Sequence, residues 1–575
     1  MKASSAVEVV KASSRHLRGS LADELTDGTP QFAADSTHLL KFHGIYQQDD
    51  RDLRKARAAK RLPLQYSCMV RTSVPGGVLT AQQWLALDGV AGELSNATLR
   101  ITTRQGVQFH FVAKQGLRPL IATLNQHLVT TLGACGDVVR NITACPAPLA
   151  DRRQGEILDA ARVLAARFRP HTPAYYELWL DGEQAVTAQH VTPAEEPIYG
   201  DSYLPRKFKI GLAWPGDNCI DVYTQDVGLV PHELDGAPGY VVLVGGGMGM
   251  SYAREEDTYP RLATELGWIQ KEHLADVTEA IVGVQRDYGD RTDRHRARLK
   301  YTIDDRGEEW FRAAVSERID SVLTDAPPLP RWDDSDEHLG WFEQADGRWF
   351  LGVHVDSGRV LDRDGQRQRT ALREVAQQFE NEFRLTARQD VLLCGIAKED
   401  RAGVDAVLAR HAMPTASSLR PVHRLAVACP ALPTCGQALG EAERVLPAVV
   451  DGVHGVLVQT GLAGLPLRVN MTGCPNGCAR PYTAEVGIVG RTKTTYDVYV
   501  GGAVGGDRLA ERLATDVQLK DLPTTLAPLL ERYATEALDD EGFGDFCARL
   551  GVEKLAELLP VIERPKRRAP SAEEE

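Results

Sequence analysis

The chain has 575 residues, of which 43% are hydrophobic and 25% charged, a composition typical of a soluble globular protein with two to four domains. Its 66 basic and 79 acidic side chains give a formal net charge of −13, which argues against a nucleic-acid surface but leaves room for a basic pocket. No apolar run reaches the roughly 18 residues of a membrane span, and residues 1–21 lack the apolar core of a secretory signal. A cytoplasmic protein without a membrane or nucleic-acid partner is therefore expected.

The predicted elements repeat once along the chain. Alternating residues predict strands over 99–107 and 383–391, and similar strand segments follow in each half. Long offsets of 284, 259 and 256 residues, in the same order, indicate a duplicated half-molecule rather than a solenoid of short units. We therefore expect pseudo-twofold architecture with a large cofactor in the cleft between the halves. The related segments are 99–107 with 383–391, 223–230 with 482–489, and 240–247 with 496–503.

Helices are predicted between these strands, at 151–168, 370–382 and 440–450, so the expected fold class is mixed α+β. The acidic, proline-rich segment 324–337 is predicted to be a linker. Residues 565–575 offer no apolar side chain except Ala and Pro, which predicts a flexible tail.

Ten cysteines are too sparse in so long a chain for a disulfide framework, but four of them form two close pairs. Five residues separate Cys429 from Cys435, three separate Cys474 from Cys478, and the pairs stand 39 positions apart. Four thiolates suit an iron–sulfur cubane or a structural zinc, although zinc prefers two to four residues between paired ligands. Nearby prolines and glycines keep the backbone irregular, so that amides can point at sulfur. The spacing favours a cluster and leaves zinc or unrelated buried thiols as alternatives.

The surroundings of these cysteines, Ala428–Arg444 and Thr472–Pro481, resemble the siroheme-dependent sulfite and nitrite reductases. The resemblance implies that Cys429, Cys435, Cys474 and Cys478 ligate a [4Fe–4S] cluster and that the Cys478 sulfur also reaches the siroheme iron. The opposite axial position is then open to substrate. The resemblance runs from about residue 16 to about residue 552, and further matching segments are 42–52, 102–105, 203–209, 291–294 and 542–546.

Reduction of sulfite to sulfide delivers six electrons and several protons to one small anion, so the site needs cations. Arginine forks bind oxyanions, and a desolvated lysine can donate a proton. The positions that match the family's active-site cations are Arg71, Arg140, Lys207 and Lys209. Lys207 and Lys209 would leave one face of a strand, with Arg206 on the other face. The alternative is an ordinary solvated charge run on an edge strand.

Siroheme carries eight carboxylates, so basic and polar groups are expected around its rim. The resemblance places these contacts on one strand face, with Arg104, Gln108 and His110, and more weakly at Thr102 and Asn141. The alternative is an exposed strand face with one satisfied histidine. Arg388, the repeat partner of Arg104, is expected to be structural or peripheral.

Two further features bear on the cofactors. Tyr46 and Cys135 match a tyrosine–cysteine thioether found in some of these reductases, although two unlinked side chains are an equal alternative. Residues 245–249 read Gly-Gly-Gly-Met-Gly, but Met250 replaces the last glycine of a dinucleotide-binding motif, which leaves a tight turn or an amide contact to siroheme. No flavin or NADPH module is found. Electrons are therefore expected from a partner, a ferredoxin or a diflavin reductase. Segments 51–57 and 291–300 are candidate docking patches, with ordinary solvated helix faces as the favoured alternative.

The implied fold is a duplicated sulfite/nitrite reductase haemoprotein, with ferredoxin-like half-repeats plus two larger α/β domains. The expected function is an assimilatory sulfite reductase haemoprotein. The alternatives are a siroheme-dependent nitrite reductase and, more remotely, a zinc-stabilised interaction protein without enzymatic activity. The predicted division is an extended N-terminal arm (1–65), a first ferredoxin-like half-domain (66–135), a larger domain with the substrate cations (136–325), a linker (326–336), a second ferredoxin-like half-domain (337–412), a domain with the cluster and siroheme ligand (413–560) and a flexible tail (561–575).

Overall fold

The computed structural model describes residues 4–149, 154–181, 196–320, 323–332, 337–363 and 365–559. The described residues form four five-stranded sheets and one two-stranded ribbon, β14 (Asp362–Arg363) with β15 (Gln366–Arg367). The two sheets built mainly from residues 45–112 and 340–396 are called the small sheets, and the two built from residues 143–270 and 427–518 are called the large sheets. The predicted tail, the first three residues of the helix predicted from 151, and linker residues 333–336 lie outside the described residues.

The two small sheets are antiparallel and exchange an edge strand. Their strands are β1 (Ile45–Asp49), β2 (Tyr66–Arg71), β3 (Val78–Leu79), β4 (Leu99–Ile101), β5 (Val107–Val112), β11 (Gly340–Glu343), β12 (Trp349–Val353), β13 (Arg359–Val360), β16 (Glu382–Leu385) and β17 (Val391–Ile396). The first sheet has the order β1-β2-β5-β4-β13 and the second has β11-β12-β17-β16-β3. Each half thus supplies the last strand of the other half's sheet, as a twofold relation requires.

The two large sheets share one topology. Their strands are β6 (Thr143–Ala144), β7 (Ile210–Leu212), β8 (Val227–Leu234), β9 (Ala237–Val244) and β10 (Thr264–Gln270), and β18 (Val427–Ala428), β19 (Val469–Thr472), β20 (Val486–Gly490), β21 (Thr495–Val500) and β22 (Glu511–Gln518). In each sheet three parallel strands are followed by two antiparallel ones, in chain order across the sheet. The predicted duplication and the α+β class are therefore confirmed.

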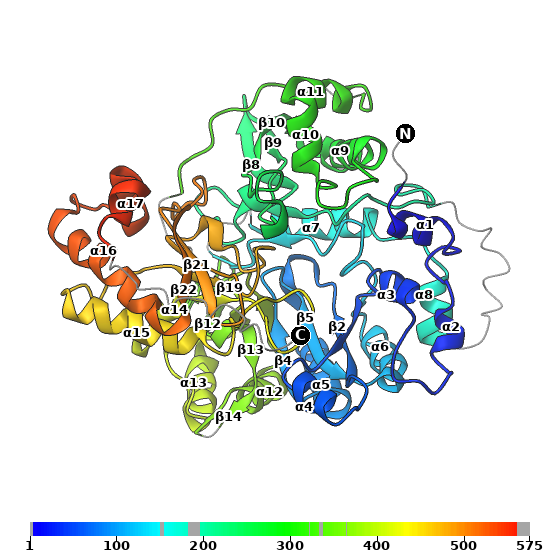
Figure 1. Ribbon diagram of the computed structural model, residues 1–575, viewed down its shortest axis with the longest axis horizontal. Coiled ribbons are helices and arrows are strands. Elements are labelled where there is room, and N and C mark those ends of the chain that lie inside the picture. The colour runs from blue at the N-terminus through cyan, green and yellow to red at the C-terminus, as the bar shows by residue number, and fades with distance from the viewer. Residues whose placement is uncertain are drawn as a thin grey trace, which may run out of the picture.

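Helices cover these sheets, as Figure 1 shows. In that view the first large sheet with α9–α11 lies at the top, the second with α15–α17 at the left, and the small sheets with their helices below. The helix α5 begins at a capping box, in which Thr80 and Gln83 satisfy each other's backbone amides. The main helices are α5 (Ala81–Leu94), α6 (Leu117–Gln126), α7 (Gln154–Arg167), α9 (Leu274–Tyr288), α10 (Leu299–Arg306), α11 (Glu308–Ser316), α12 (Gln368–Phe379), α13 (Arg401–Arg410), α15 (Leu446–Gln459), α16 (Leu522–Glu536) and α17 (Phe543–Leu550).

The N-terminal segment, predicted as an extended arm, contains four helices that pack onto the fold. Leu17, Leu21 and Leu40 are fully buried there. The helices are α1 (Ala6–Ala12), α2 (Leu21–Glu24), α3 (Ala34–Leu40) and α4 (Arg54–Ala59).

Some predicted elements were wrong in detail. The segments 99–107 and 383–391 are not single strands; each is a hairpin, because a turn stabilised by Gln105 (φ 54°) in one half and by Gln389 (φ 76°) in the other interrupts it. The helix predicted at 440–450 is α15, which begins only at Leu446, where a proline in its first turn suits a helix start, and runs to Gln459.

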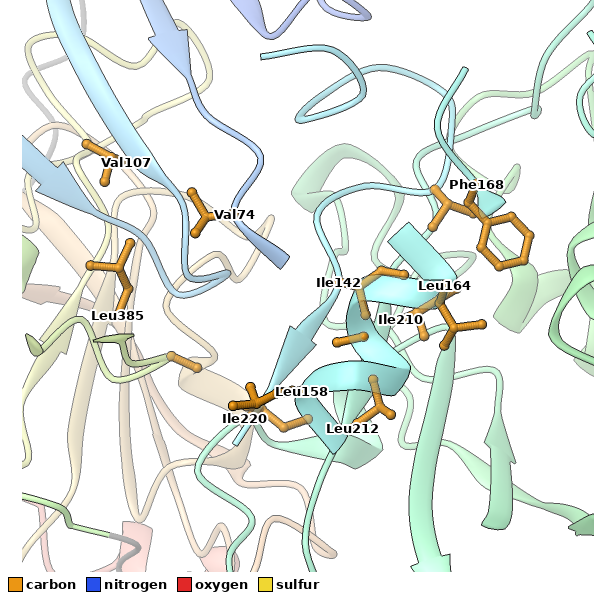
Figure 2. Close-up of a cluster of buried hydrophobic side chains, with 14 of the residues drawn as sticks. Val74, Val107, Ile142, Leu158, Leu164, Phe168, Ile210, Leu212, Ile220 and Leu385 are labelled. Carbon is orange, nitrogen blue, oxygen red and sulfur yellow. The ribbon is translucent and has the colours of Figure 1, made fainter. Parts of the chain in front are cut away.

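One hydrophobic core joins the first half to the second small sheet, while the second large sheet has a core of its own. Figure 2 shows Val107 of the first small sheet, Leu385 of the second, and Ile210 and Leu212 of the first large sheet in one apolar cluster beside α7. All four side chains are fully buried. Because such a core cannot be split without exposing apolar surface, the first half and the second small sheet form one packed unit.

Candidate cofactor and anion-binding site

A cavity of about 500 Å³ lies where the first small sheet meets both large-sheet regions. Its walls come from β2 and β5, from residues 136–140 and 206–207 of the first half, and from the two cysteine loops, 428–438 and 473–478, of the second half. All four predicted cluster cysteines line it: Cys429, Cys435, Cys474 and Cys478. The volume is in the range of ligand-binding cavities.

Hydrogen-bond donors surround the cysteine sulfurs. The Gly473 amide donates to Cys429 Sγ at 3.3 Å, and the Thr472 hydroxyl contacts the same sulfur at 3.5 Å. Asn476 Nδ2 lies 3.5 Å from Cys474 Sγ. Donors of this kind temper the negative charge of thiolates, as the glycine-rich loops predict. Burial raises the pKa of the Cys429 thiol to about 12, so only a bound cation would hold it as a thiolate near neutral pH.

The spacing of the sulfurs distinguishes a cluster from a zinc ion. Tetrahedral zinc with bonds of about 2.3 Å holds its sulfur ligands about 3.8 Å apart. Among the described residues, the one group of three or more Cys, His or acidic ligand atoms within 4.8 Å of one another lies elsewhere, at Cys145, Asp217 and Cys219. The four cavity cysteines nevertheless influence one another electrostatically. The four cysteines therefore share one site, but their sulfur atoms are spaced more widely than the ligands of a single zinc ion. A wider spacing of this kind suits a cubane cluster.

Cations dominate the cavity wall. Among the described residues that line it, seven are Lys or Arg and one, Asp137, is a carboxylate. Such an excess suits a polyanionic cofactor and a small anionic substrate. The seven are Lys41, Arg71, Arg100, Arg140, Arg206, Lys207 and Arg294.

Three of the four predicted substrate cations, Arg71, Arg140 and Lys207, line the cavity, whereas Lys209 lies behind the wall. The Lys209 ammonium donates to the Thr224 carbonyl at 3.3 Å. The expected strand over these lysines is wrong, because a bend is followed by a single bridge at Phe208, next to β7. Arg206 consequently lines the same cavity as Lys207 instead of pointing away.

Burial changes the protonation of both lysines. Burial, with repulsion from Arg140 and Arg298, lowers the pKa of Lys207 to about 7. Burial, with repulsion from Arg298 and Arg104, lowers the pKa of Lys209 well below its usual value. A lysine that titrates near neutral pH is suited to donate a proton and to be recharged.

Polar groups on β5 complete one wall. Gln108 meets Arg71, and with its carboxamide oxygen toward the guanidinium it accepts from Nη2 at 2.5 Å and from Nε at 3.1 Å. His110 is buried, and burial, with Arg359 and Arg100 nearby, lowers its pKa well below the usual value, so the ring is neutral. Neither ring nitrogen of His110 has a partner in the described structure. Buried polar atoms without partners in a cavity wall fit a bound group that supplies them. Thr102 also lines the cavity.

Arg104 and Asn141 hold the wall rather than line it. Arg104 lies in the turn between β4 and β5, so its expected place on a strand face is wrong. Its guanidinium donates to Gln225 Oε1 at 2.8 Å and to the Asn141 carbonyl, and Asn141 Nδ2 returns a bond to the Arg104 carbonyl at 2.7 Å. Burial lowers the pKa of Arg104 to about 9. These bonds fasten the first small sheet to the first large sheet.

Tyr46 and Cys135 meet at the edge of the cavity. Burial together with the nearby Cys135 thiol raises the pKa of the Tyr46 phenol. Arg71 Nη1 lies 3.1 Å from Cys135 Sγ, and the Arg71 guanidinium carbon lies 5.9 Å from the centre of the Tyr46 ring. The contact that a thioether would need is present, while the bond itself stays a prediction.

Sequence analysis missed several wall residues. Arg100 donates to the Ala428 carbonyl at 2.8 Å beside Cys429, and Arg294 pairs with Asp137 at 2.9 Å. Lys41 directly precedes the matching segment 42–52, and Arg294 ends the segment 291–294, so extending each match into the cavity would have found both.

The glycine-rich segment 245–249 braces a cysteine loop. The amide of Met250 donates to the Pro475 carbonyl at 3.0 Å, and Gly477 takes a φ of 63° against the backbone of Met248. A side chain at Gly477 would be strained in that conformation. The segment therefore packs on the loop that carries Cys474 and Cys478, and an amide contact with siroheme stays a prediction.

The fold and the site define a redox protein that joins a four-thiolate iron–sulfur centre to a cavity for a polyanionic cofactor. Residues 135–323 and 422–567 match the nitrite and sulphite reductase 4Fe-4S domain, and residues 64–127 and 342–411 match the nitrite/sulfite reductase ferredoxin-like half domain. The chain belongs to the nitrite and sulfite reductase family. Siroheme and a [4Fe–4S] cluster, the predicted cofactors, are confirmed by this membership and fit the donor set described above.

Full-length relatives agree with this assignment. A protein named sulfite reductase [NADPH] hemoprotein beta-component from Myxococcus xanthus (strain DK1622) is 45% identical over 549 residues, which are 95% of this chain and 96% of the relative. Proteins of the same name from Geobacillus thermodenitrificans (strain NG80-2) and Xanthomonas euvesicatoria pv. vesicatoria (strain 85-10) are 41% and 43% identical, over 95–96% of this chain and 96–97% of theirs. The solved structure of Mycobacterium tuberculosis NirA covers 95% of both chains with a TM-score of 0.76, and at 22% identity it shows the fold alone. No helix in the described part of the chain is long and apolar enough to cross a membrane.

Proposed function

We propose that the chain is the haemoprotein of an assimilatory sulfite reductase, which reduces sulfite to sulfide by six electrons. The observation that carries the proposal is the convergence of the four cysteines with Arg71, Arg140 and Lys207 on one cavity. The relatives that are 41–45% identical over nearly the whole chain are named as sulfite reductases, which favours sulfite over nitrite. When bound, the siroheme and the cluster supply the substrate-binding iron and the electrons.

The chain's own residues bind the anion and supply protons. Arg71 and Arg140 are proposed to bind the oxygens of sulfite, and Gln108 orients Arg71 through the hydrogen bonds described above. Lys207 is proposed as a proton donor, because its pKa of about 7 permits it to release and regain a proton. Lys209 stays a proposed contributor that acts through its electrostatic influence on Lys207.

The proposed cluster ligands are Cys429, Cys435, Cys474 and Cys478. Cys478 is the exposed member of the four, which suits its proposed second contact with the siroheme iron. Thr102, Gln108 and His110 are proposed contacts of the siroheme rim. The two ring nitrogens of His110, which have no partner among the described residues, support this proposal. Arg104 and Asn141 are proposed to act indirectly, by holding the wall in place.

The proposed electron donor is a flavoprotein that oxidises NADPH, because the relatives' names contain that cofactor. A ferredoxin is the alternative donor, and the proposed location is the cytoplasm. Three arginines of segment 291–300 are not available to a partner, since Arg291, Arg294 and Arg298 pair with buried carboxylates. Arg51 in the other candidate segment is likewise engaged, with the cysteine loop.

Comparing kcat/KM for sulfite and for nitrite, with the same reduced viologen as donor, tests the substrate. We expect a clear preference for sulfite. A preference for nitrite would replace the proposal with the nitrite reductase alternative, and turnover of neither anion by the protein with both cofactors bound would contradict both.

A further inference from the structure

The first half contains counterparts of two cluster cysteines. The repeat offset of 284 residues relates Cys145 to Cys429, and the offset of 259 relates Cys219 to Cys478. Cys145 directly follows β6 as Cys429 follows β18, and Cys219 lies between β7 and a short helical turn, η5 (Val222–Thr224), as Cys478 lies between β19 and η11 (Pro481–Thr483). The shared sheet topology makes these positions structurally equivalent.

The equivalent place cannot hold a second cluster and siroheme. Pro215 stands at the position of Cys474, so the four-thiol set is incomplete. In the matching hairpin, Leu392 and Cys394 stand where Gln108 and His110 line the cofactor cavity, and both are buried against Phe350. Hydrophobic side chains therefore fill the place of the second cavity, while the two thiols are kept.

The two retained thiols sit in a compact set of ligand atoms. Cys145 Sγ, Cys219 Sγ and a carboxylate oxygen of Asp217 all lie within 4.8 Å of one another, and all three residues are buried. His338 Nε2 lies 2.9 Å from Asp217 Oδ2, with its side chain 9% exposed, and it also contacts Cys219. Cys145 Sγ meets the Asp217 carbonyl oxygen at 2.8 Å.

This donor set matches zinc. Zinc takes Cys, His and Asp ligands in a tetrahedron, with bonds of about 2.0–2.3 Å, so its ligand atoms lie roughly 3.3–3.8 Å apart. Cys145 Sγ, Cys219 Sγ and the Asp217 oxygen need to close by only about 1 Å to reach that spacing. His338 lies outside this group of three, and its Nε2 would join them from its place 2.9 Å from Asp217 Oδ2. Two thiolates, a carboxylate and the ion sum to one negative charge, and Arg388 lines the small pocket beside Cys219 and His338.

We propose that Cys145, Cys219, Asp217 and His338 form a structural zinc site, separate from the redox centre. Zinc binds cysteine as thiolate and histidine as the neutral imidazole, so the two thiol protons leave the site as the ion enters. His338 lies between the linker and β11, whereas the other ligands belong to the first large-sheet region. The ion therefore fastens the start of the second half to the first, next to the Trp332 indole, which donates to the Trp214 carbonyl at 3.0 Å.

Metal analysis of the holoenzyme tests the site. The purified protein is incubated with zinc chloride, washed on a chelating resin and measured by plasma mass spectrometry and zinc-edge X-ray absorption. We expect one zinc per chain beside the iron, with two sulfur neighbours at about 2.3 Å and two nitrogen or oxygen neighbours at about 2.0 Å. Substoichiometric zinc, or zinc without sulfur neighbours, overturns the proposal.

Variants separate this site from other thiols. Cys219→Ala and His338→Ala should each lose the zinc but keep the iron and the siroheme absorption. Cys394→Ala removes a buried thiol outside the set and should keep the zinc. His338→Ala leaves both thiols in place, so it decides the matter if Cys219→Ala fails to fold. The proposal would be overturned if His338→Ala, and Cys219→Ala where it folds, still bound one zinc per chain.

Discussion

At the scale of single residues, the burial of Lys207 lowers its pKa to a value that suits its proposed role as a proton donor. The chain places this lysine on the cavity wall among arginines, with a pKa of about 7. Replacing it by methionine keeps the volume but removes the proton. We expect Lys207→Met to lower turnover with sulfite by about 10²-fold, the range of one acid–base group, and to leave the absorption spectrum of the cofactors unchanged.

The control for this measurement is Lys493→Met, which changes the same residue type at an exposed position. It should turn over like the parent enzyme. Equal turnover of Lys207→Met and the parent would remove Lys207 from the mechanism.

The same lysine predicts a pH effect on the stability of the siroheme-free protein. The pKa of Lys207 is about 7 when folded and 10.5 as its ordinary value, so between these values the unfolded chain binds more protons. Stability relative to Lys207→Met should therefore rise between pH 7 and pH 9, by up to about 2 kcal/mol. Urea unfolding of both apoproteins at several pH values measures the difference. Parallel curves would show that burial does not depress the pKa.

A covalent link between Tyr46 and Cys135 is the third residue-scale prediction, because their side chains meet beside Arg71. Oxidative formation of a thioether removes two hydrogens, so the intact mass after cofactor extraction should be lower than the sequence mass by that amount. Cys135→Ala should show its full sequence mass. A parent protein at full sequence mass would mean that the two residues are unlinked.

At the scale of elements, Arg51 fixes the first cysteine loop. Its side chain donates to the carbonyls of Cys435 and Ala438 at 3.1 and 2.5 Å, and its amide donates to Pro433 at 3.3 Å. Arg51→Met leaves two loop carbonyls without this donor. We expect the purified variant to contain less acid-labile sulfide and iron per chain than the parent, while its helical circular dichroism stays that of the parent.

Arg57→Met is the matched control, because Arg57 lies in the same segment and bonds the Pro63 carbonyl at 2.6 Å, away from the cysteines. It should keep its cluster. Equal cluster content in both variants would show that the loop holds without Arg51.

The element scale also shows where the sequence was informative. Repeated sequence patterns predicted the duplication, and the spacing within each cysteine pair predicted a shared four-thiol site. Both signals consist of residue types at fixed positions within short segments, so they can be read from the sequence. The turn at Gln105 was missed because its left-handed backbone angle gives no alternation signal, so Arg104 was misplaced on a strand. Arg100 was missed because only the tertiary fold brings it to the cavity.

At the scale of the whole molecule, the duplicated halves have unequal sites. The first half provides the substrate cations and the second provides the cysteines, and the exchanged strands β3 and β13 tie their small sheets together. A single cavity between unequal halves accounts for one cofactor pair in a twofold fold. This asymmetry follows from particular substitutions, such as Leu392 at the position of Gln108, and not from the repeat itself.

The most direct test of the central claim is the cofactor content of the purified chain, made in a host that synthesises siroheme. Extracted siroheme, iron and acid-labile sulfide are measured per chain. The account predicts one siroheme, about five iron atoms and about four sulfides, one iron being in the siroheme. A colourless protein without siroheme, or one whose iron content is unaffected by Cys474→Ala, would contradict it.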